Sequence, residues 1–251
     1  MSSLAGKTAV VTGGSRGFGR GIVEALAAEG MRVVAVARGE EDLGRLKREV
    51  KGQVEIVCGD VTDPVLAARV IEREKPHALV LNAGARGVNR PTRLQTWDTF
   101  ATQVHVDLKS AFLWTREALV LPLGQGSAII LGSSGAALRP VFVNAGYAAA
   151  KAAIWAFAQG VAGEARQMGI RVHCLLPVMA PETEVGREAL KDFSKYTGAT
   201  EEQIIEQKGM RPFVTPAIVA DAVVSILTDP SKATAVGFRV TGGGLVAIGD
   251  A

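Results

Sequence analysis

The sequence predicts a single-domain α/β fold in which a doubly wound, mostly parallel seven-stranded sheet carries helices on both faces. Short runs rich in Val and Ile recur along the 251 residues, with helical patterns between them, which is typical of alternating strands and helices. The runs are continuously apolar, as strands are when both faces of a sheet are covered. With 48% hydrophobic and 21% charged residues, the chain has enough apolar material to fill one core.

Seven strands are expected, and six helices lie among them. The strands are placed at residues 8–11, 32–37, 54–58, 78–81, 128–131, 172–176 and 238–241. The helices are placed at residues 18–29, 40–51, 64–74, 98–120, 147–168 and 216–228. Residues 118–138 carry no charge, but Pro122 and several glycines interrupt them, so they are interpreted as a helix end and a buried strand rather than a transmembrane helix.

Charge and cysteine content argue against several classes of protein. The 28 basic and 25 acidic residues leave a net charge of +3, spread thinly, which favours neither nucleic acid nor an anionic membrane as a partner. Cys58 and Cys174 stand far apart with no Cys or His cluster beside them, so neither a disulfide nor a metal site is expected. No secretory pattern opens the sequence, and reduced thiols fit a cytoplasmic protein.

A glycine-rich turn follows the first expected strand and leads into the first helix. It comprises Thr12, Gly13, Gly14, Ser15, Arg16, Gly17, Phe18 and Gly19. Glycines let the backbone turn tightly and approach a diphosphate, which a helix N-terminus stabilises. The turn therefore indicates a dinucleotide site. Its Gly-x-x-x-Gly-x-Gly spacing differs from Gly-x-Gly-x-x-Gly, however, and a glycine cluster alone can be an ordinary loop.

The end of the second expected strand discriminates between nicotinamide cofactors. A carboxylate here would hold the free ribose hydroxyls of NAD, but Ala37 and Arg38 occupy this place. An arginine binds a 2′-phosphate through charge-assisted hydrogen bonds, and Arg16 could approach from the glycine turn. The sequence thus favours NADP(H) over NAD(H). The alternatives are that both arginines are merely solvated, or that Glu40 or Glu41 turns inward.

Tyr147 and Lys151 stand four residues apart in an expected helix, so both side chains lie on one face. The ammonium can stabilise a tyrosinate, which suits the phenol to general acid–base catalysis. Ser134, just past a buried strand, could hold a carbonyl oxygen beside the phenol. Each residue also has an ordinary structural interpretation, but the combination favours catalysis.

These motifs together resemble the short-chain dehydrogenase/reductase (SDR) family, and most of all its 3-oxoacyl-thioester reductases. The resemblance runs in order along nearly the whole chain, through the glycine turn, Asp60-Val61, Asn82-Ala83-Gly84, Ser134, Tyr147, Lys151 and Pro177. It implies a Rossmann-like fold and hydride transfer between NADP(H) and a carbonyl or secondary alcohol. Tyr147 would exchange the proton and Ser134 would orient the substrate oxygen. It also implies a homotetramer or, less often, a homodimer.

The resemblance also implies the cofactor contacts. Asp60 and Val61 would lie near the adenine, and Lys151 at the nicotinamide ribose. The full expected cofactor set is Gly13, Ser15, Arg16, Gly17, Phe18, Gly19, Arg38, Asp60, Val61, Asn82, Ala83, Gly84, Tyr147, Lys151, Pro177 and Val178. The expected catalytic set is Ser134, Tyr147, Lys151 and Asp107.

Several positions depart from the family pattern. The family's catalytic Asn falls on Asp107, which when ionised only accepts hydrogen bonds and attracts the Lys151 ammonium. Val178 stands where Gly is usual, and Thr183 and Thr241 also deviate. These departures leave a second hypothesis open, a catalytically weak or inactive cofactor-binding sensor or scaffold.

Residues 178–213 form a long connection that is expected to be the substrate lid. They carry their own helical pattern and begin at the carboxyl end of a strand, where ligands bind in parallel sheets. Loop arginines near the same cleft could attract an acidic or acyl-thioester substrate, or could be simply solvated. They are Arg86, Arg90, Arg93 and Arg139. An acidic substrate predicts that Arg139→Ala raises KM more for a carboxylated carbonyl than for a neutral ketone.

Overall fold

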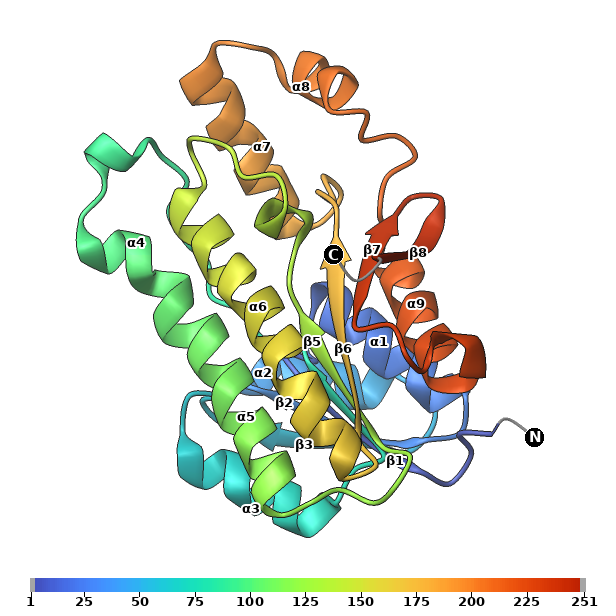
Figure 1. Cartoon of the computed structure of the whole chain (residues 1–251). Coiled ribbons are helices and arrows are strands. Elements are labelled where there is room, and N and C mark those ends of the chain that lie inside the picture. Colours follow the sequence, from blue (N-terminus) through green and yellow to red (C-terminus); the bar gives the residue numbers. More distant parts are fainter. Residues whose placement is uncertain (1–2, 249–251) are drawn as a thin grey trace.

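The computed structural model describes residues 3–248 and confirms the α/β class. A single sheet lies between layers of helices (Figure 1). Its strands run in the order β3-β2-β1-β4-β5-β6-β7-β8, and every neighbouring pair is parallel except β7 and β8. The strand order reverses between β1 and β4, which is the switch point where such folds bind ligands.

The bounds of the elements lie close to the expected ranges. The strands are β1 (Thr8–Thr12), β2 (Arg32–Ala37), β3 (Val54–Cys58), β4 (Ala78–Leu81), β5 (Ala128–Gly132), β6 (Arg171–Pro177), β7 (Gly237–Thr241) and β8 (Gly244–Ile248). The helices are α1 (Gly17–Ala28), α2 (Glu40–Glu49), α3 (Pro64–Glu74), α4 (Trp97–Gln103), α5 (Lys109–Val120), α6 (Ala145–Gln167), α7 (Glu184–Thr197), α8 (Glu201–Gln207) and α9 (Pro216–Thr228). Among residues 3–248, no helix is long and apolar enough to span a bilayer.

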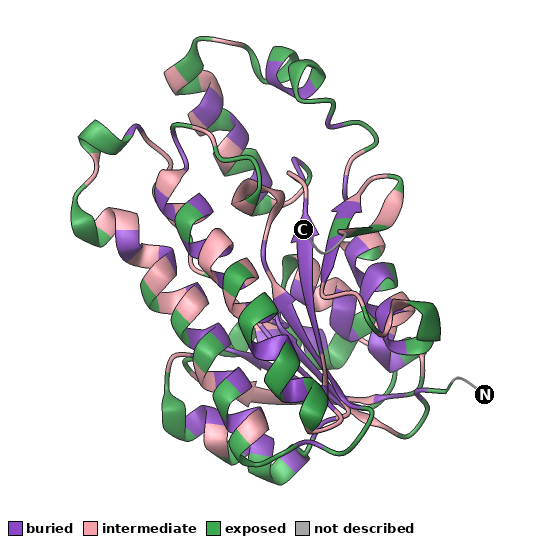
Figure 2. Ribbon diagram, in the orientation of Figure 1, coloured by how far each residue is buried: buried purple, intermediate pink, exposed green. Residues whose placement is uncertain are grey.

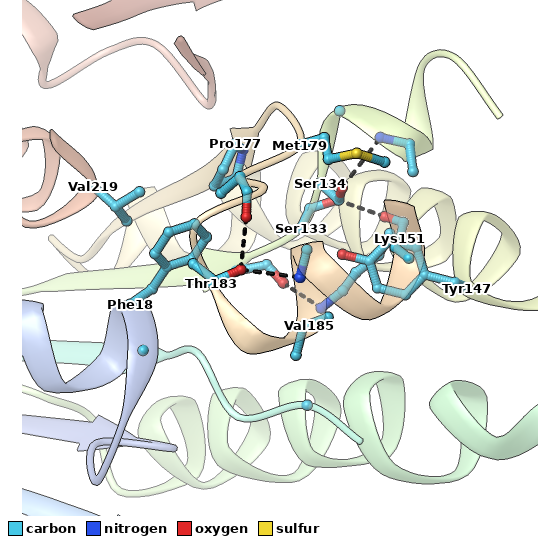
Figure 3. Close-up of a pocket in the computed structure, with 18 of the residues that line it drawn as sticks. Phe18, Ser133, Ser134, Tyr147, Lys151, Pro177, Met179, Thr183, Val185 and Val219 are labelled. Carbon is cyan, nitrogen blue, oxygen red and sulfur yellow. Dashed lines mark hydrogen bonds between the residues drawn. The ribbon is translucent and has the colours of Figure 1, made fainter. Parts of the chain in front are cut away.

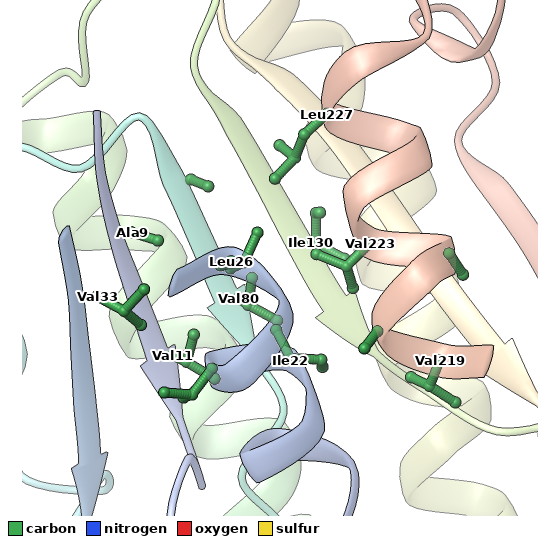
Figure 4. Packing of buried hydrophobic residues seen from close by; sticks show 14 of the residues in the cluster. Ala9, Val11, Ile22, Leu26, Val33, Val80, Ile130, Val219, Val223 and Leu227 are labelled. Carbon is green, nitrogen blue, oxygen red and sulfur yellow. The ribbon is translucent and has the colours of Figure 1, made fainter. Parts of the chain in front are cut away.

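Two clusters of buried hydrophobic residues hold the sheet between its helices. Along β1, Ala9 and Val11 belong to the cluster under α1 and α9, whereas Val10 belongs to the cluster on the other face. Figure 4 shows Ile22 of α1 and Val223 of α9 against the first face. The central strands are buried along almost their whole length (Figure 2). Burial on both faces explains why the strand sequences are continuously apolar.

The sheet has eight strands within the described residues, so the expected number of seven is wrong. β8 returns from β7 and pairs with it in the antiparallel direction. The turn uses Gly244 at a φ of +107°, a conformation that side chains rarely adopt. β8 lies at the sheet edge, where Val246 is 55% exposed. Its sequence is nevertheless an apolar run, so β8 differs from the buried strands in exposure and not in composition.

The single helix expected at 98–120 is two helices joined by a wider turn, which corrects that expectation. α4 is capped by Thr96, whose hydroxyl accepts a hydrogen bond from the N–H of Thr99. A π-helical turn, Val104–Leu108, then leads into α5. Such a turn inserts one residue, and the apolar pattern does not mark it. It contains Asp107, which is buried at 2% exposure.

The lid segment, residues 178–213, contains α7 and α8. Thr183 and Thr200 cap these helices by accepting hydrogen bonds from the N–H groups of Gly186 and Gln203. The segment contributes most of a small hydrophobic cluster that includes Phe193. It therefore has its own packing as well as its contacts with the rest of the fold.

Both ends of the lid segment pack tightly against backbone. A Cβ on Gly186 would lie 1.9 Å from the carbonyl oxygen of Ala180. At the other end, a Cβ on Gly242 would lie 1.9 Å from the carbonyl oxygen of Pro212. No side chain fits at either place, so glycine is required at both positions.

Candidate active site

A cavity of about 1300 Å³ opens at the carboxyl ends of the parallel strands and is bordered by the lid segment. Its wall is formed by the glycine turn, the residues that follow β2 to β6, and the start of α6. Of the residues expected at the site, all except Gly19 line it. No group of three or more potential metal ligands occurs in the described part of the chain.

The glycine turn fits a dinucleotide phosphate. Gly13 and Gly17 have φ angles of +66° and +55°, which favour glycine. A Cβ on Gly13 would lie 2.8 Å from the Cα of Ala83, and one on Gly19 would lie 2.0 Å from the Gly13 oxygen. Arg16 precedes α1 without capping it, so the first N–H groups of the helix receive no side-chain hydrogen bond from that position. These groups are left for an anion.

Arg38 lines the cavity directly after β2, is exposed, and forms no ion pair with any residue in 3–248. Arg16 also lines the cavity, and its Nη1 lies 3.7 Å from Oε2 of Glu184 on the lid segment. Neither Glu40 nor Glu41 lines the cavity. The alternative in which one of them supplies the missing carboxylate therefore has no support in this arrangement.

Asp60 and Val61 form a fixed edge of the cavity after β3. The Oδ1 of Asp60 accepts hydrogen bonds from the backbone N–H of Thr62 at 2.8 Å and from its hydroxyl at 2.9 Å. These bonds, the backbone one first, lower the pKa of Asp60. The carbonyl of Val61 accepts a hydrogen bond from the Trp114 indole at 2.9 Å.

The residues after β4 are joined to the glycine turn. The N–H of Ala83 donates to the Thr12 hydroxyl at 3.2 Å, and the Asn82 amide donates to the Gly13 carbonyl at 3.5 Å. The segment Asn82 to Gly84 therefore supports the turn that is expected to hold the diphosphate.

A buried ion pair lies at the cavity wall. Lys151 Nζ is 3.1 Å from Asp107 Oδ2, and the two side chains are 8% and 1% exposed. The ammonium also donates to the Gly132 carbonyl at 3.0 Å. Asp107 Oδ1 accepts a hydrogen bond from the N–H of Ala85 at 2.7 Å. Gly84 leaves room for the carboxylate, because a Cβ there would lie 3.0 Å from Oδ2.

The environment of Lys151 keeps it charged. Burial disfavours the charge, but attraction to Asp107, with a smaller contribution from Tyr147, outweighs it and raises the pKa of Lys151 above its ordinary value. A carboxylate at position 107 accepts from both the ammonium and the Ala85 N–H, whereas an amide has a single acceptor oxygen. Asp107 is thus accommodated by the surrounding structure.

Ser134 and Tyr147 lie next to Lys151 at the cavity wall (Figure 3). The Ser134 hydroxyl accepts a hydrogen bond from the N–H of Ala136 at 3.2 Å, which leaves its proton for another acceptor. Lys151 Nζ is 5.7 Å from the Tyr147 ring centroid. The Ser133 hydroxyl donates to the Lys151 carbonyl at 2.8 Å and so ties the end of β5 to α6. A hydroxyl, a phenol and an ammonium thus converge, a set that can polarise and protonate a carbonyl.

Pro177, Val178 and Thr183 line the cavity where β6 leads into the lid segment (Figure 3). The N–H of Val178 donates to the Val240 carbonyl at 3.0 Å, which fixes this stretch to β7. The Thr183 hydroxyl donates to the Ala180 carbonyl at 2.8 Å while it caps α7. Thr183 therefore already has a structural role at the start of the lid helix.

Acidic side chains of α7 pair with basic groups across the cavity. Glu184 forms ion pairs with Arg86 and with Arg16, and Glu188 Oε1 lies 3.4 Å from Arg86 Nη1. The hydrogen bond to Glu184 raises the pKa of Arg86. Arg86 is thus occupied by the lid segment, which argues against its expected role toward an acidic substrate.

The other loop arginines differ in their positions. Arg139 lines the cavity and forms no ion pair within the described residues, so it stays available. Arg90 and Arg93 do not line the cavity, and a Nη2 of Arg90 lies 3.4 Å from the Thr99 hydroxyl. Of the two interpretations given for these arginines, joint recognition of an acidic substrate by all four has no support here, because Arg90 and Arg93 do not line the cavity.

Several polar residues that the sequence did not single out also line the cavity, among them Gln103, Asn144 and Asp42. Gln103 and Asn144 are 4% and 8% exposed. Asn144 stands three residues before Tyr147, a spacing that could have marked it. Gln103 offers no such signal, because its amide packs against Gly87, which is distant in the sequence.

Comparison with known proteins defines the class. A family model described as short chain dehydrogenase matches residues 7–193, a stretch that contains the glycine turn, Ser134, Tyr147 and Lys151. This chain therefore belongs to the short-chain dehydrogenase family and is an oxidoreductase of that family. The resemblance stated from the sequence is confirmed.

Individual relatives extend over nearly the whole chain. L-xylulose reductase of Bos taurus is 30% identical over 233 residues, which cover 92% of this chain and 93% of the relative. An actinorhodin polyketide ketoreductase solved with NADPH has a TM-score of 0.82 and 27% identity, covering 97% of this chain and 98% of its own. The 3-ketoacyl-(acyl-carrier-protein) reductase from Brucella melitensis complexed with NADH has a TM-score of 0.80 and 26% identity, covering 96% and 99%.

Proposed function

We propose that this protein is an NADP(H)-dependent oxidoreductase that transfers a hydride between the nicotinamide and a small carbonyl compound or secondary alcohol. The observation that carries the proposal is the convergence of Ser134, Tyr147 and Lys151 on the cavity that the glycine turn also lines. Family membership, and similar structures that hold NADPH or NADH, support a nicotinamide cofactor.

The chain's own residues hold the cofactor in this proposal. The N–H groups at the start of α1 bind the diphosphate, and Arg38 with Arg16 binds the 2′-phosphate. Asp60 and Val61 border the adenine. The free, exposed guanidinium of Arg38 supports NADP(H) over NAD(H). When bound, the nicotinamide supplies or accepts the hydride.

Proton transfer falls to Tyr147. During reduction its phenol gives a proton to the substrate oxygen, and during oxidation it takes the proton back. Ser134 donates a hydrogen bond to the same oxygen. Lys151 stabilises the tyrosinate, and Asp107 holds the ammonium in place through the buried ion pair.

The proposed substrate is a small carbonyl compound or alcohol over which the lid segment closes. The name of one relative, L-xylulose reductase, supports a small compound. The names of the two similar structures, a polyketide ketoreductase and a 3-ketoacyl-(acyl-carrier-protein) reductase, support a carbonyl compound in general. Arg139 is the proposed contact for a substrate that carries an acidic or acyl-thioester group. We further propose a cytoplasmic homotetramer or homodimer; Phe112 and Val120, exposed at 48% and 56% on α5, support self-association.

A second candidate is a catalytically weak or inactive cofactor-binding protein. The buried pairing of Lys151 with Asp107 favours it, because the carboxylate competes with a tyrosinate for the ammonium. The presence of Ser134 and Tyr147 at the same wall favours catalysis.

The first experiment titrates the purified protein with NADPH and NADH, followed by nicotinamide fluorescence, and repeats both titrations with Arg38→Asp. We expect NADPH to bind at least about tenfold more tightly, and the variant to reverse this preference. Equal affinities, or a variant that keeps the original preference, would contradict the assignment of NADP(H).

A panel of carbonyl compounds then tests the chemistry, with Tyr147→Phe as the inactive control. We expect this variant to lose at least about 100-fold in kcat and to keep its affinity for NADPH. Binding of NADPH without turnover of any carbonyl would favour the second candidate. Binding of neither cofactor would contradict both.

A further inference from the structure

We propose that Gln103, seated against Gly87, forms a polar subsite that recognises a second oxygen on the substrate, a hydroxyl or carbonyl group beside the one that reacts. The inference rests on the proposed function, because it narrows the substrate class of that same cavity. The expected substrates are carbonyl compounds that carry a further uncharged oxygen substituent.

Gln103 is buried at the end of α4, four residues before Asp107, and lines the cavity. Its side-chain amide forms no hydrogen bond with any residue in 3–248, although a primary amide offers two donors and an acceptor. Some side-chain atoms of the described chain are fully enclosed and have no hydrogen-bond partner, but none of them belongs to Gln103. The Gln103 amide is therefore not sealed off, and a ligand in the cavity can reach it. Burying an amide unpaired is costly, and a ligand in the cavity would supply the partner.

Gly87 makes the space for this amide. A Cβ on Gly87 would lie 1.4 Å from Nε2 of Gln103, 2.4 Å from its Cδ and 2.6 Å from its Oε1. The amide therefore lies directly against the backbone of the loop after β4, and any side chain at position 87 would displace it. Gly87 lines the same cavity.

The loop that carries Gly87 is also connected to the lid segment. Asn89 lines the cavity, and its Nδ2 donates to Oδ2 of Asp192 on α7 at 3.2 Å. Gln103 thus lies beside a loop that contacts the lid segment.

Asn144 adds a second unused donor to the cavity. Its Oδ1 accepts a hydrogen bond from the N–H of Val141 at 3.0 Å, while its Nδ2 donates to no residue of the described chain. It is 8% exposed and stands three residues before Tyr147. Two buried, uncharged amides in the cavity of Ser134 and Tyr147 can serve hydroxyl and carbonyl oxygens of a substrate.

The test compares hydroxycyclohexanones with methylcyclohexanones of the same substitution pattern, which differ only by hydroxyl for methyl. Binding to the protein saturated with NADP⁺ is measured by saturation-transfer difference NMR, so no turnover is needed. We expect at least one hydroxycyclohexanone to bind about tenfold more tightly than its methyl counterpart, and Gln103→Met to remove the difference.

Two further variants complete the test. Gly87→Ala leaves Gln103 chemically intact but displaces its amide, so it should remove the same preference. Gln167→Met makes the same chemical change at an exposed position of α6 and should leave the preference unchanged. Equal binding of both ligand series to the wild type, or a preference that survives Gln103→Met, would overturn the subsite. Absence of carbonyl turnover alongside an intact, Gln103-dependent preference would contradict the proposed function and not the subsite.

Discussion

The ion pairs that border the cavity fall into two regions that differ in burial. Lys151 and Asp107 are 8% and 1% exposed, whereas Arg86 and Glu184 are 47% and 52% exposed. Removing one partner of a buried pair leaves an uncompensated charge in the interior, while an exposed pair contributes little and is screened by salt. Loss of one charge should therefore destabilise the cavity wall at Lys151 and Asp107 far more than the lid segment.

The largest expected effect is on stability and belongs to the buried region. Asp107→Ala leaves the Lys151 ammonium without its counter-charge and should lower the free energy of unfolding by about 3–5 kcal/mol. Urea denaturation measures this. Glu184→Ala, the matched change in the exposed region, should leave the unfolding midpoint unchanged. If Asp107→Ala and Glu184→Ala lose similar amounts of unfolding free energy, the buried and the exposed ion pairs do not differ in their effect on stability.

The pH dependence of stability provides a sharper comparison. The pKa of Lys151 is raised above 10.5 in the folded protein. The stabilisation is therefore fully present below about pH 10.5 and is lost as the pH rises through the folded pKa.

The variant Asp107→Asn should show the opposite sign. Without the carboxylate, burial lowers the pKa of Lys151, so the unfolding free energy should increase as the pH rises toward about 10.5. Urea denaturation at pH values from about 8 to about 11.5 measures both slopes. Parallel slopes in wild type and variant would show that Asp107 does not control the charge of Lys151.

The smallest effect is expected in the lid segment. Glu184→Gln removes the ion pairs to Arg86 and Arg16, so amide hydrogen exchange in α7 should become a few-fold faster at low salt. At about 1 M salt the wild type should approach the variant, because the Debye length falls to about 3 Å. Glu182→Gln changes an exposed carboxylate that forms no ion pair within the described residues, and serves as the control. If the difference in exchange rate between wild type and Glu184→Gln does not depend on salt, packing and not charge is its cause.

The sequence predicted those parts of the fold that local patterns encode. The sequence predicts the central strands because burial on both faces of a sheet requires continuous apolar residues. It predicts the glycine turn because the turn needs positive φ angles, which Gly13 and Gly17 supply. β8 was missed although it is apolar throughout, because it follows β7 after two residues with no helix between them, which breaks the alternation of strands and helices. The turn Val104–Leu108 was missed because one inserted residue leaves the apolar spacing of the flanking helices intact.

The same limit applies to the candidate site. Tyr147 and Lys151 could be paired from the sequence because a helix fixes their spacing. The partners of Arg86 could not, because Glu184 approaches it from an element almost one hundred residues later in the chain. The position of the Gln103 amide depends on the space that Gly87 leaves free, and that space exists only once the two segments have packed together.

The close approaches of Gly186 to Ala180 and of Gly242 to Pro212 have a consequence for protein engineering. The contact of Gly186 lies within the lid segment itself, whereas that of Gly242 joins the end of the segment to the turn after β7. A segment exchanged at residues 178–213 would need a glycine at the position of Gly186, and its last residues would have to meet the backbone at Gly242. Such an exchange would leave Ser134, Tyr147, Lys151 and Gln103 unchanged, so it would separate the segment's contribution to substrate choice from theirs.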